Sequence, residues 1–560
     1  MRAWPRLVLA LLLGLALPAA PAAAGPPPPK LIVVIAVDQF SSELFDRYRD
    51  RFASGLQQLA GGIAFAKGYQ SHAATETCPG HSTILTGRHP AATGIVSNVW
   101  FDVKTGSYVY CVGVAGTGDP DARGPQNLRV DTFGDWLKAA EPGARVVSVS
   151  GKDRAAIMLA GHHPDAVYWW RDGRGFGTSS FAGPAGPDVT GPADTFNASV
   201  FDGWRKASPP LWPDAVPPDC APLEAPHVFG TKPVSGRVPP DASRDVETGP
   251  DFLARTDFQD QLRASPLFDR VTLDFAAQLI GLRQLGRGPA TDVLAVSLSA
   301  TDYVGHRYGN GGAEMCANLH ALDDALGRFL GNLASSGVPF MVVLTADHGA
   351  VDAAEREAEQ GVPARRIDAI ALVKALNDYL KQAFAIGYDP IVGDDPEQLV
   401  INAPGDAAFH ARLRDAAIAW LKTQPEVNAV FPADEIVRAV PAPGKTPDQL
   451  TLAERFHESY DADRSGDIIV ALSEYATLGV PRGPTDGVAG HGSPWDYDRQ
   501  VPILFWWPGI APASLPDPVE TVDIAPTLAG VAGIAAPPVD GRCLVKVSSS
   551  CGPDVPAQPK

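Results

Sequence analysis

The chain has 560 residues, of which 64 are acidic and 46 are basic, giving a formal net charge of −18. Apolar residues make up 45 % and charged residues 20 %, a globular composition that excludes a disordered or fibrous protein. The acidic surplus argues against nucleic acid as a specific partner, because phosphate backbones are bound by surpluses of Lys and Arg. Small phosphorylated substrates are still compatible with a negative net charge, since they need only a local positive site.

The first 24 residues have the pattern of a secretory signal peptide. Arg2 and Arg6 precede an apolar run from Leu7 to Leu17, and a stretch of small residues ends at Ala24. The apolar run is too short to span a membrane comfortably. We therefore expect residues 1–24 to be removed, and a periplasmic or secreted protein without a membrane partner.

Six cysteines suggest disulfides in an oxidising compartment. Cys543 and Cys551 lie close together near the C-terminus, and we expect them to pair. The pairing of the other four is left open by the sequence; they stand at positions 78, 111, 220 and 316.

Continuous apolar runs rich in β-branched residues predict strands that are buried on both faces. These runs are Leu31–Val37, Val146–Val149, Asp292–Leu298, Phe340–Leu344 and Val501–Trp506. Apolar residues at helical spacing predict helices between them, at Asp131–Ala140, Pro266–Leu285 and Cys316–Leu333. This alternation predicts an α/β fold with a largely parallel sheet.

Two long segments depart from the alternation. Residues 181–250 contain 14 prolines without sustained periodicity, which indicates a surface insertion. Residues from about 355 to 480 include predicted helices at Ile367–Phe384 and Asp406–Lys422, and we expect a small α/β lobe there that caps the site. The prediction is one catalytic domain over residues 25–560, with insertions at about 160–260 and about 355–480.

Three carboxylates follow predicted strands, at Asp38, Asp302 and Asp347. Ligand sites of open α/β sheets form at the carboxyl ends of the strands. His306 and His348 stand close to two of these carboxylates, and His491 lies between two glycines. A single such Asp is more often a helix N-cap, but the combination favours Zn²⁺, which binds imidazole nitrogen and carboxylate oxygen. The other histidines, His81 among them, lack such pairing, and we expect surface or packing roles for them.

The segment from Thr75 to Gly87 is typical of a loop that enters a short helix. Pro79 suits the first turn and Gly87 suits the end. Thr77 would then lie at the helix N-terminus, where unpaired N–H groups favour an anion. Its hydroxyl is a candidate nucleophile if a metal ion lies close by, and otherwise it is only a helix N-cap.

Taken together, Asp38 and the motifs TETCPGH, DYVGH, TADHG and AGHGS resemble the alkaline phosphatase superfamily in order and in local sequence. The resemblance runs from about Leu31 to about residue 545. It is strongest to bacterial periplasmic alkaline phosphatases with a threonine nucleophile, of the Sphingomonas and flavobacterial type. It implies a three-layer α/β/α sandwich with a largely parallel central sheet and two Zn²⁺ ions.

The resemblance also implies roles for individual residues. One zinc ion would be held by Asp302, His306 and His491. The other would be held by Asp38, Asp347 and His348, with Thr77 completing its site. Thr77 would be the nucleophile, and the phosphoryl oxygens would be bound by Asn98, Lys152, Arg154 and the backbone N–H of Cys78.

We therefore expect a zinc-dependent alkaline phosphatase that acts on phosphate monoesters as a monomer. A phosphodiesterase or nucleotide pyrophosphatase would share the metal ligands but have less need of Lys152 and Arg154, since a diester carries one charge. A sulfatase would need an Arg shortly after Cys78 and Pro79, which this sequence lacks. A metal-stabilised binding protein would lack a nucleophile or a ligand, and none is missing.

Overall fold

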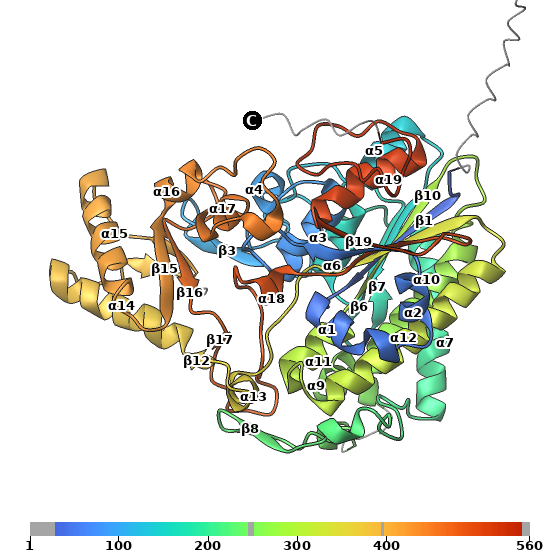
Figure 1. The fold of residues 1–560 in the computed structure, drawn as a ribbon, viewed down its shortest axis with the longest axis horizontal. Helices are drawn as coiled ribbons and strands as arrows, with labels where there is room; N and C mark the ends of the chain where they lie inside the picture. Colours follow the sequence, from blue (N-terminus) through green and yellow to red (C-terminus); the bar gives the residue numbers. More distant parts are fainter. Residues whose placement is uncertain (1–27, 245–250, 394–396, 552–560) are drawn as a thin grey trace, which may run out of the picture.

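The computed structural model describes residues 28–244, 251–393 and 397–551 (Figure 1). The predicted signal peptide lies outside these residues. Across the described ranges, every helix falls short of the length and apolarity that a membrane crossing requires.

A nine-stranded sheet, built entirely from described residues, forms the centre of the molecule. Its strands in spatial order are β19 (Ala513–Glu520), β2 (Ile63–Tyr69), β18 (Ile503–Trp506), β11 (Phe340–Thr345), β1 (Leu31–Val37), β10 (Asp292–Leu298), β5 (Val146–Ser150), β6 (Ala166–Arg171) and β7 (Gly175–Gly177). The strands from β11 to β6 run parallel, whereas β18 and β7 are antiparallel to their neighbours. The predicted mixed α/β fold with a largely parallel sheet is confirmed.

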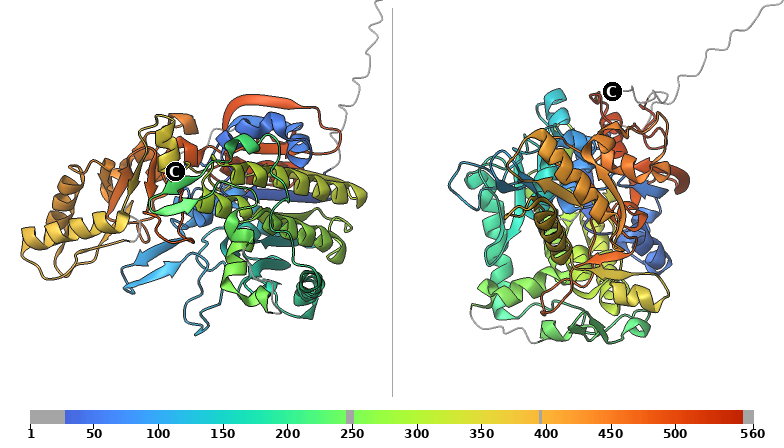
Figure 2. Two further views of the ribbon diagram at one scale, coloured as in Figure 1. Left: turned by 90° about the horizontal axis from the view of Figure 1, so that it is seen from below. Right: turned by 90° about the vertical axis from the view of Figure 1, so that its left-hand side faces the viewer.

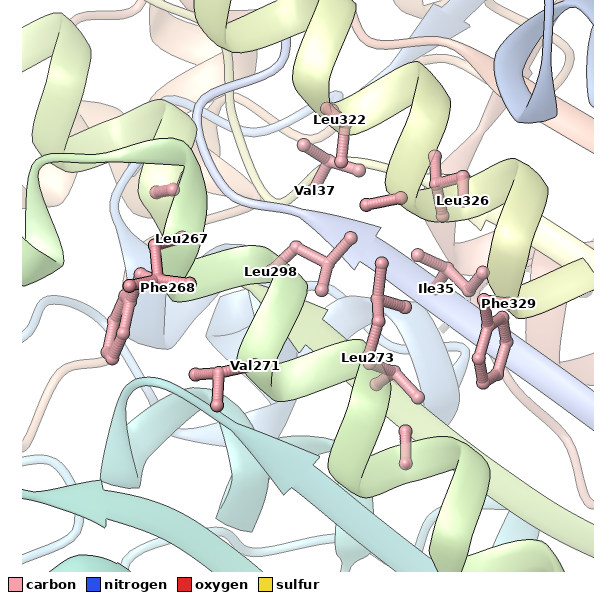
Figure 3. Packing of buried hydrophobic residues seen from close by; sticks show 14 of the residues in the cluster. Ile35, Val37, Leu267, Phe268, Val271, Leu273, Leu298, Leu322, Leu326 and Phe329 are labelled. Atoms are coloured by element: carbon pink, nitrogen blue, oxygen red, sulfur yellow. The ribbon is translucent and has the colours of Figure 1, made fainter. Parts of the chain in front are cut away.

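Strand β1 packs its side chains alternately into two hydrophobic clusters, one on each face of the sheet. Ile35 and Val37 point to the first face, where helices α10 (Pro266–Leu282) and α12 (Ala313–Ser335) cover them (Figure 3). Helices α1 (Ser42–Tyr48), α2 (Gly55–Ala60) and α7 (Pro187–Lys206) contribute to the same cluster. A strand covered on both faces must be apolar throughout, which explains the sequence LIVVIAV.

The second face of the sheet buries Ile32, Val34 and Ala36 of the same strand. The helices that supply side chains to this cluster are α3 (Thr77–Thr86), α5 (Phe133–Ala140), α6 (Asp153–Ala160) and α19 (Ile524–Ala532). The first cluster is the larger of the two, because the long helices α10 and α12 lie on that face.

A second, smaller lobe lies at one end of the molecule (Figures 1 and 2). Its four-stranded sheet has the order β13 (Ile391–Val392), β14 (Gln398–Ile401), β16 (Ile468–Leu472) and β15 (Val427–Pro432). Helices α14 (Ala369–Phe384) and α15 (Ala407–Leu421) pack on it and agree with the predicted helices within a few residues. Beside them lie α16 (Ala433–Arg438), α17 (Leu452–His457), and the strand pair β12 (Arg365–Ile367) and β17 (Ala476–Leu478).

The proline-rich segment contains a helix that the sequence analysis did not predict. Helix α7 buries Val189, Ala193, Phe196 and Trp204 against the core, at helical spacing. Prolines at its first position and inside it hid this pattern, although proline is tolerated in the first turn. Strands β6 and β7, which precede it, join the central sheet.

Three disulfides join the six cysteines. The predicted Cys543–Cys551 bridge is present, and Cys220–Cys316 ties a loop to α12. The third bridge, Cys78–Cys111, connects the start of α3 to the end of the hairpin formed by β3 (Val99–Asp102) and β4 (Ser107–Tyr110). The remaining elements are α4 (Pro90–Thr93), β8 (His227–Phe229), β9 (Lys232–Val234), α8 (Asp241–Arg244), α9 (Thr256–Arg263), α11 (Ala300–Tyr308), α13 (Ala354–Glu359) and α18 (Asp496–Arg499).

Candidate metal and phosphate-binding site

The carboxyl ends of the adjacent strands β11, β1 and β10 bring the three predicted carboxylates together. Asp38 directly follows β1, and Asp347 lies just past β11. Asp302 lies beyond β10, in the first turn of α11. All three side chains are buried, so positive charge must lie close by to compensate them.

Asp302, His306 and His491 form a first group of ligand-type side chains. His306 lies one turn after Asp302 in α11, as predicted, and its Nε2 is 3.3 Å from Asp302 Oδ1. His491 Nε2 is 3.5 Å from the same oxygen. Each imidazole pairs its Nδ1 with a backbone carbonyl at 2.9 Å, His306 with Ala489 and His491 with Thr75. With Nδ1–H as the donor, each Nε2 is left to bind a metal ion.

Asp38, Asp347 and His348 form a second group next to the first. His348 Nε2 lies 3.4 Å from Asp38 Oδ1 and 3.3 Å from Asp347 Oδ2. Its Nδ1 pairs with the Gly349 carbonyl at 2.9 Å. Ligand atoms of Asp38, Asp302 and His348 all lie within 4.8 Å of one another, so Asp302 reaches both groups.

The buried polar atoms that lack a hydrogen-bond partner within the described ranges include Asp38 Oδ1, Asp302 Oδ1 and His348 Nε2, at the centre of the site. Buried groups of this kind are costly unless a cation binds them. Carboxylate oxygen and imidazole nitrogen together are a donor set that Zn²⁺ accepts. The structure therefore brings the six Asp and His side chains of the predicted ligand set together in an arrangement that fits metal binding.

Lys152 is a buried cation between the two groups. Its Nζ lies 2.5 Å from Asp38 Oδ2 and 2.6 Å from Asp302 Oδ2. Burial by itself would raise the pKa of Asp38, but the Lys152 ammonium and His348 outweigh it, and the pKa falls below its usual range. Burial would likewise lower the pKa of Lys152, but Asp302 and Asp38 raise it above its ordinary value. Lys152 is therefore charged, and it partly neutralises both groups.

Thr77 is the first residue of α3, as predicted, and its side chain is buried. Two cations converge on its hydroxyl: Lys152 Nζ at 3.5 Å and Arg154 Nη2 at 3.4 Å from Oγ1. Arg154 Nε is buried without a hydrogen-bond partner in the described part of the chain. A guanidinium with a spare donor beside a hydroxyl suits an incoming phosphoryl group.

Asn98 lies on the other side of Thr77, just before the β3–β4 hairpin. Its Oδ1 accepts a hydrogen bond from the Cys78 backbone N–H at 2.8 Å. The N–H that the sequence analysis expected to hold a phosphoryl oxygen is therefore occupied by Asn98 in this structure. The Asn98 amide and the Cys78 N–H lie together at the N-terminus of α3, where an anion is favoured.

Glu76 was missed by the sequence analysis. Its carboxylate accepts hydrogen bonds from the Asn98 backbone N–H at 2.8 Å and from the Ser97 hydroxyl at 3.1 Å. Burial raises the pKa of Glu76 above its ordinary value, while the bonds to Asn98 and Ser97 oppose that rise. The only sequence signal was its place directly before Thr77, and this gave no hint that it contacts a loop far along the chain.

The expectation of an unpaired His81 was wrong. His81 is buried, with Nδ1 at 3.0 Å from Asp347 Oδ2 and 2.9 Å from the Thr77 carbonyl, and Nε2 at 2.9 Å from the Ser297 hydroxyl. It therefore connects α3 to a predicted metal ligand. Asp347 and Ser297 come from distant parts of the sequence, so local spacing could not reveal these two contacts.

A cavity of about 740 Å³ opens onto this site. Thr77, Asn98 and Arg154 line its floor together with the first ligand group. The side walls come from the β3–β4 hairpin and from the smaller lobe. The site is thus accessible to a small molecule that carries a phosphoryl group.

Comparisons with known proteins agree with this geometry. The family model "Type I phosphodiesterase / nucleotide pyrophosphatase" matches residues 32–494. Alkaline phosphatase PhoD of Zymomonas mobilis subsp. mobilis is 41 % identical over 527 residues, covering 91 % of this chain and 87 % of PhoD. Alkaline phosphatase PhoK of a Sphingomonas species is 40 % identical over 525 residues, covering 91 % and 90 % of the two chains.

The solved structures include a similar fold over nearly the whole chain. The crystal structure of wild-type alkaline phosphatase PafA superposes with a TM-score of 0.77 at 27 % identity, covering 91 % of this chain and 97 % of PafA. The resemblance predicted from the motifs is confirmed. The chain belongs to the type I phosphodiesterase and nucleotide pyrophosphatase family, within the alkaline phosphatase superfamily.

Proposed function

We propose that this chain is a zinc-dependent alkaline phosphatase that hydrolyses phosphate monoesters through a phosphothreonine intermediate on Thr77. One observation carries the proposal: Lys152 and Arg154 converge on Thr77 Oγ1, at 3.5 and 3.4 Å. Phosphoryl transfer depends mainly on positioning and charge neutralisation, and a monoester dianion needs positive charge at this place. The named alkaline phosphatases among its relatives support a phosphoric monoester hydrolase.

Six side chains would hold the metal ions, in the two groups described above: Asp302, His306 and His491, and Asp38, Asp347 and His348. Zinc bound there supplies Lewis-acid charge that favours the ionised Thr77 hydroxyl and stabilises the departing oxygen. Lys152 balances the carboxylates of both groups through its contacts to Asp38 and Asp302.

Thr77 acts as the nucleophile. Its hydroxyl gives up its proton to solvent, and Oγ1 forms a bond to phosphorus while the bond from phosphorus to the ester oxygen breaks. The departing alkoxide takes a proton from solvent and leaves as the alcohol. A water molecule then attacks the phosphothreonine, which restores Thr77 and releases inorganic phosphate. The hydroxyl of Thr75 is an unsuitable alternative, because it donates to the Ser493 carbonyl at 2.8 Å.

Three side chains bind the non-bridging oxygens in this proposal. Arg154 offers a planar pair of donors, Lys152 a point charge, and Asn98 an amide at the α3 N-terminus. The Cys78 N–H donates to Asn98 in the present structure and becomes available to phosphate only if Asn98 turns. Asn98 and Arg154 both line the cavity, so both can reach a bound ester.

A diesterase is the second candidate, because the matching family model is named for diesterases and pyrophosphatases. The two cations beside Thr77 favour the monoester. A diester monoanion would gain less from them, and its second substituent would need room where Arg154 lies.

Export of the chain and its organisation belong to the same proposal. Residues 1–24 act as a signal peptide, and residues 25–560 form the exported catalytic chain, which acts as a monomer in the periplasm or outside the cell. Three disulfides support this, since disulfides persist in oxidising compartments. The lobe within the insertion at about 355–480 caps the site. The expected insertion at about 160–260 begins with β6 and β7, which are strands of the central sheet, and only the part after them, including α7, packs on the first face.

Replacing the nucleophile tests the proposal. Thr77→Ala should lower kcat for p-nitrophenyl phosphate on the order of a thousandfold while metal content stays unchanged. Thr77→Ser is the matched control and should keep substantial activity, and mass spectrometry of quenched turnover should find phosphate on residue 77. Full activity of Thr77→Ala would contradict the assignment.

A further inference from the structure

Exposed apolar side chains surround the mouth of the catalytic cavity. Val99, Tyr108, Leu478 and Val480 are between 37 and 45 % exposed, and all four line this cavity. Single exposed apolar residues are ordinary on protein surfaces, but a set gathered around one opening marks a binding surface. We therefore expect a bound ligand to cover these four side chains.

The first apolar wall is the β3–β4 hairpin. Val99 directly follows Asn98, and Phe101 packs edge-to-face against Tyr108 with ring centroids 5.3 Å apart. The Cys78–Cys111 disulfide fixes the base of this hairpin to α3. The apolar wall is therefore held at a set distance from Thr77.

The second wall comes from the chain that leaves the smaller lobe. Leu478 ends β17, and Val480 follows it before the chain returns to the site at His491. Both side chains line the cavity, as does Leu472 of β16. The two walls thus come from segments far apart in the sequence. The first directly follows Asn98, and the chain leads from the second to His491.

The cavity opens onto one ligand group only. Asp302, His306 and His491 line it, whereas Asp38, Asp347 and His348 are absent from its lining within the described residues. In an in-line displacement, the leaving oxygen departs on the side opposite the attacking oxygen. With Thr77 attacking, the leaving group points from the phosphoryl site into the space between the apolar walls.

The charged residues at the opening have a small acidic excess. Glu397, Asp486 and Arg464 line the cavity. Hydrogen bonds from backbone N–H groups hold the pKa of Asp486 below its usual value. The whole chain carries a net charge of −18. An uncharged organic group fits this opening better than a second phosphate would.

We infer that the cavity mouth is a leaving-group subsite for uncharged apolar or aromatic alcohols. This inference rests on the proposed monoesterase function. The subsite stabilises the substrate by burying apolar surface between the hairpin and the Leu478 wall, so it acts on binding of the ester and not on phosphate itself.

The test compares two esters in a variant that removes one wall. Leu478→Ser/Val480→Ser should raise KM for phenyl phosphate about five- to tenfold, with kcat nearly unchanged. KM for methyl phosphate and the inhibition constant of inorganic phosphate should both stay within about twofold of the wild-type values. Ile370→Ser is the matched control, because Ile370 is 81 % exposed and lies outside the cavity lining.

Four outcomes would overturn the inference. Equal loss with both esters would show a general disturbance of the site, and no loss with either would show that the walls do not contact the leaving group. A matching KM change in Ile370→Ser would assign the effect to the surface as a whole. Absence of monoesterase activity in the wild type would remove the proposed function and the subsite together, which distinguishes that failure from the first two.

Discussion

Contacts with neighbouring residues fix the positions of the charged side chains in this site. Glu76 accepts hydrogen bonds from the backbone of Asn98 and from Ser97, and so fixes the amide that faces Thr77. Lys152 bonds both Asp38 and Asp302 while it points at Thr77. Glu76 and Lys152 therefore act on the proposed phosphoryl site partly through the residues that they contact.

Glu76→Gln should weaken phosphate binding without removing the nucleophile. A neutral amide accepts the Asn98 N–H less strongly than a carboxylate, so Asn98 should be held less firmly. We expect KM and the inhibition constant of phosphate to rise about five- to tenfold, with a smaller effect on kcat. Steady-state kinetics with phosphate as inhibitor measure this. Glu76→Asp should recover part of the loss if the carboxylate is what matters, and unchanged constants in Glu76→Gln would contradict the positioning role.

The site residues that could be predicted from the sequence are those that stand close to one another along the chain. Asp302 and His306 are four residues apart on a helix, and His348 is adjacent to Asp347, so their proximity follows from local geometry. Glu76 and His81 escaped it because their partners, Asn98 and Asp347, are brought to them only by the folded sheet. A contact between segments that are far apart along the chain produces no recognisable spacing in a single sequence.

At the scale of elements, the site depends on how closely α3 approaches the end of β11. A Cβ on Gly80 would lie 2.0 Å from the Asp347 carbonyl oxygen, so only glycine allows this contact. The same approach brings His81 to Asp347 and sets Thr77 beside Lys152. Strands β1, β5, β10, β11 and β18 were predicted from their apolar runs, whereas β2, β6, β7 and β19 of the same sheet were not. Helix α7 was missed because its prolines disguised a helical pattern.

Gly80→Ala should displace α3 and lower both stability and activity. Overpacking against backbone costs about 1–3 kcal/mol, and a shift of Thr77 should lower kcat at least about tenfold. Thermal unfolding and phosphatase kinetics measure the two effects. Gly331→Ala is the matched control, since Gly331 lies within α12 with open space around its Cβ position and should be neutral or slightly stabilising. Wild-type kinetics in Gly80→Ala would contradict the close approach.

At the scale of the whole molecule, the site between the two lobes gathers more buried carboxylates than cations. Asp38, Asp302 and Asp347 are buried together, and Lys152 is the cation that contacts two of them. Bound metal ions would complete the balance, and they would bind the folded chain far better than the unfolded one. Metal content should therefore be coupled to global stability.

Removal of metal by a chelator should lower the melting temperature by several degrees. Each metal ion bound at about a thousand times its Kd adds about 4 kcal/mol to the free energy of unfolding, and that stabilisation disappears with the ion. Differential scanning calorimetry with and without chelator measures the change, and added Zn²⁺ should restore it. Asp302→Asn serves as the comparison, because it should lower the melting temperature in the presence of zinc and respond less to the chelator. A melting temperature indifferent to metal would contradict the coupling.

The most direct measurement is a zinc titration of the metal-free protein, with rates recorded on p-nitrophenyl phosphate and on bis(p-nitrophenyl) phosphate. The account predicts monoesterase activity that appears with zinc, saturates at two ions per chain and far exceeds the diesterase activity. Monoesterase activity without metal, or a preference for the diester, would contradict it.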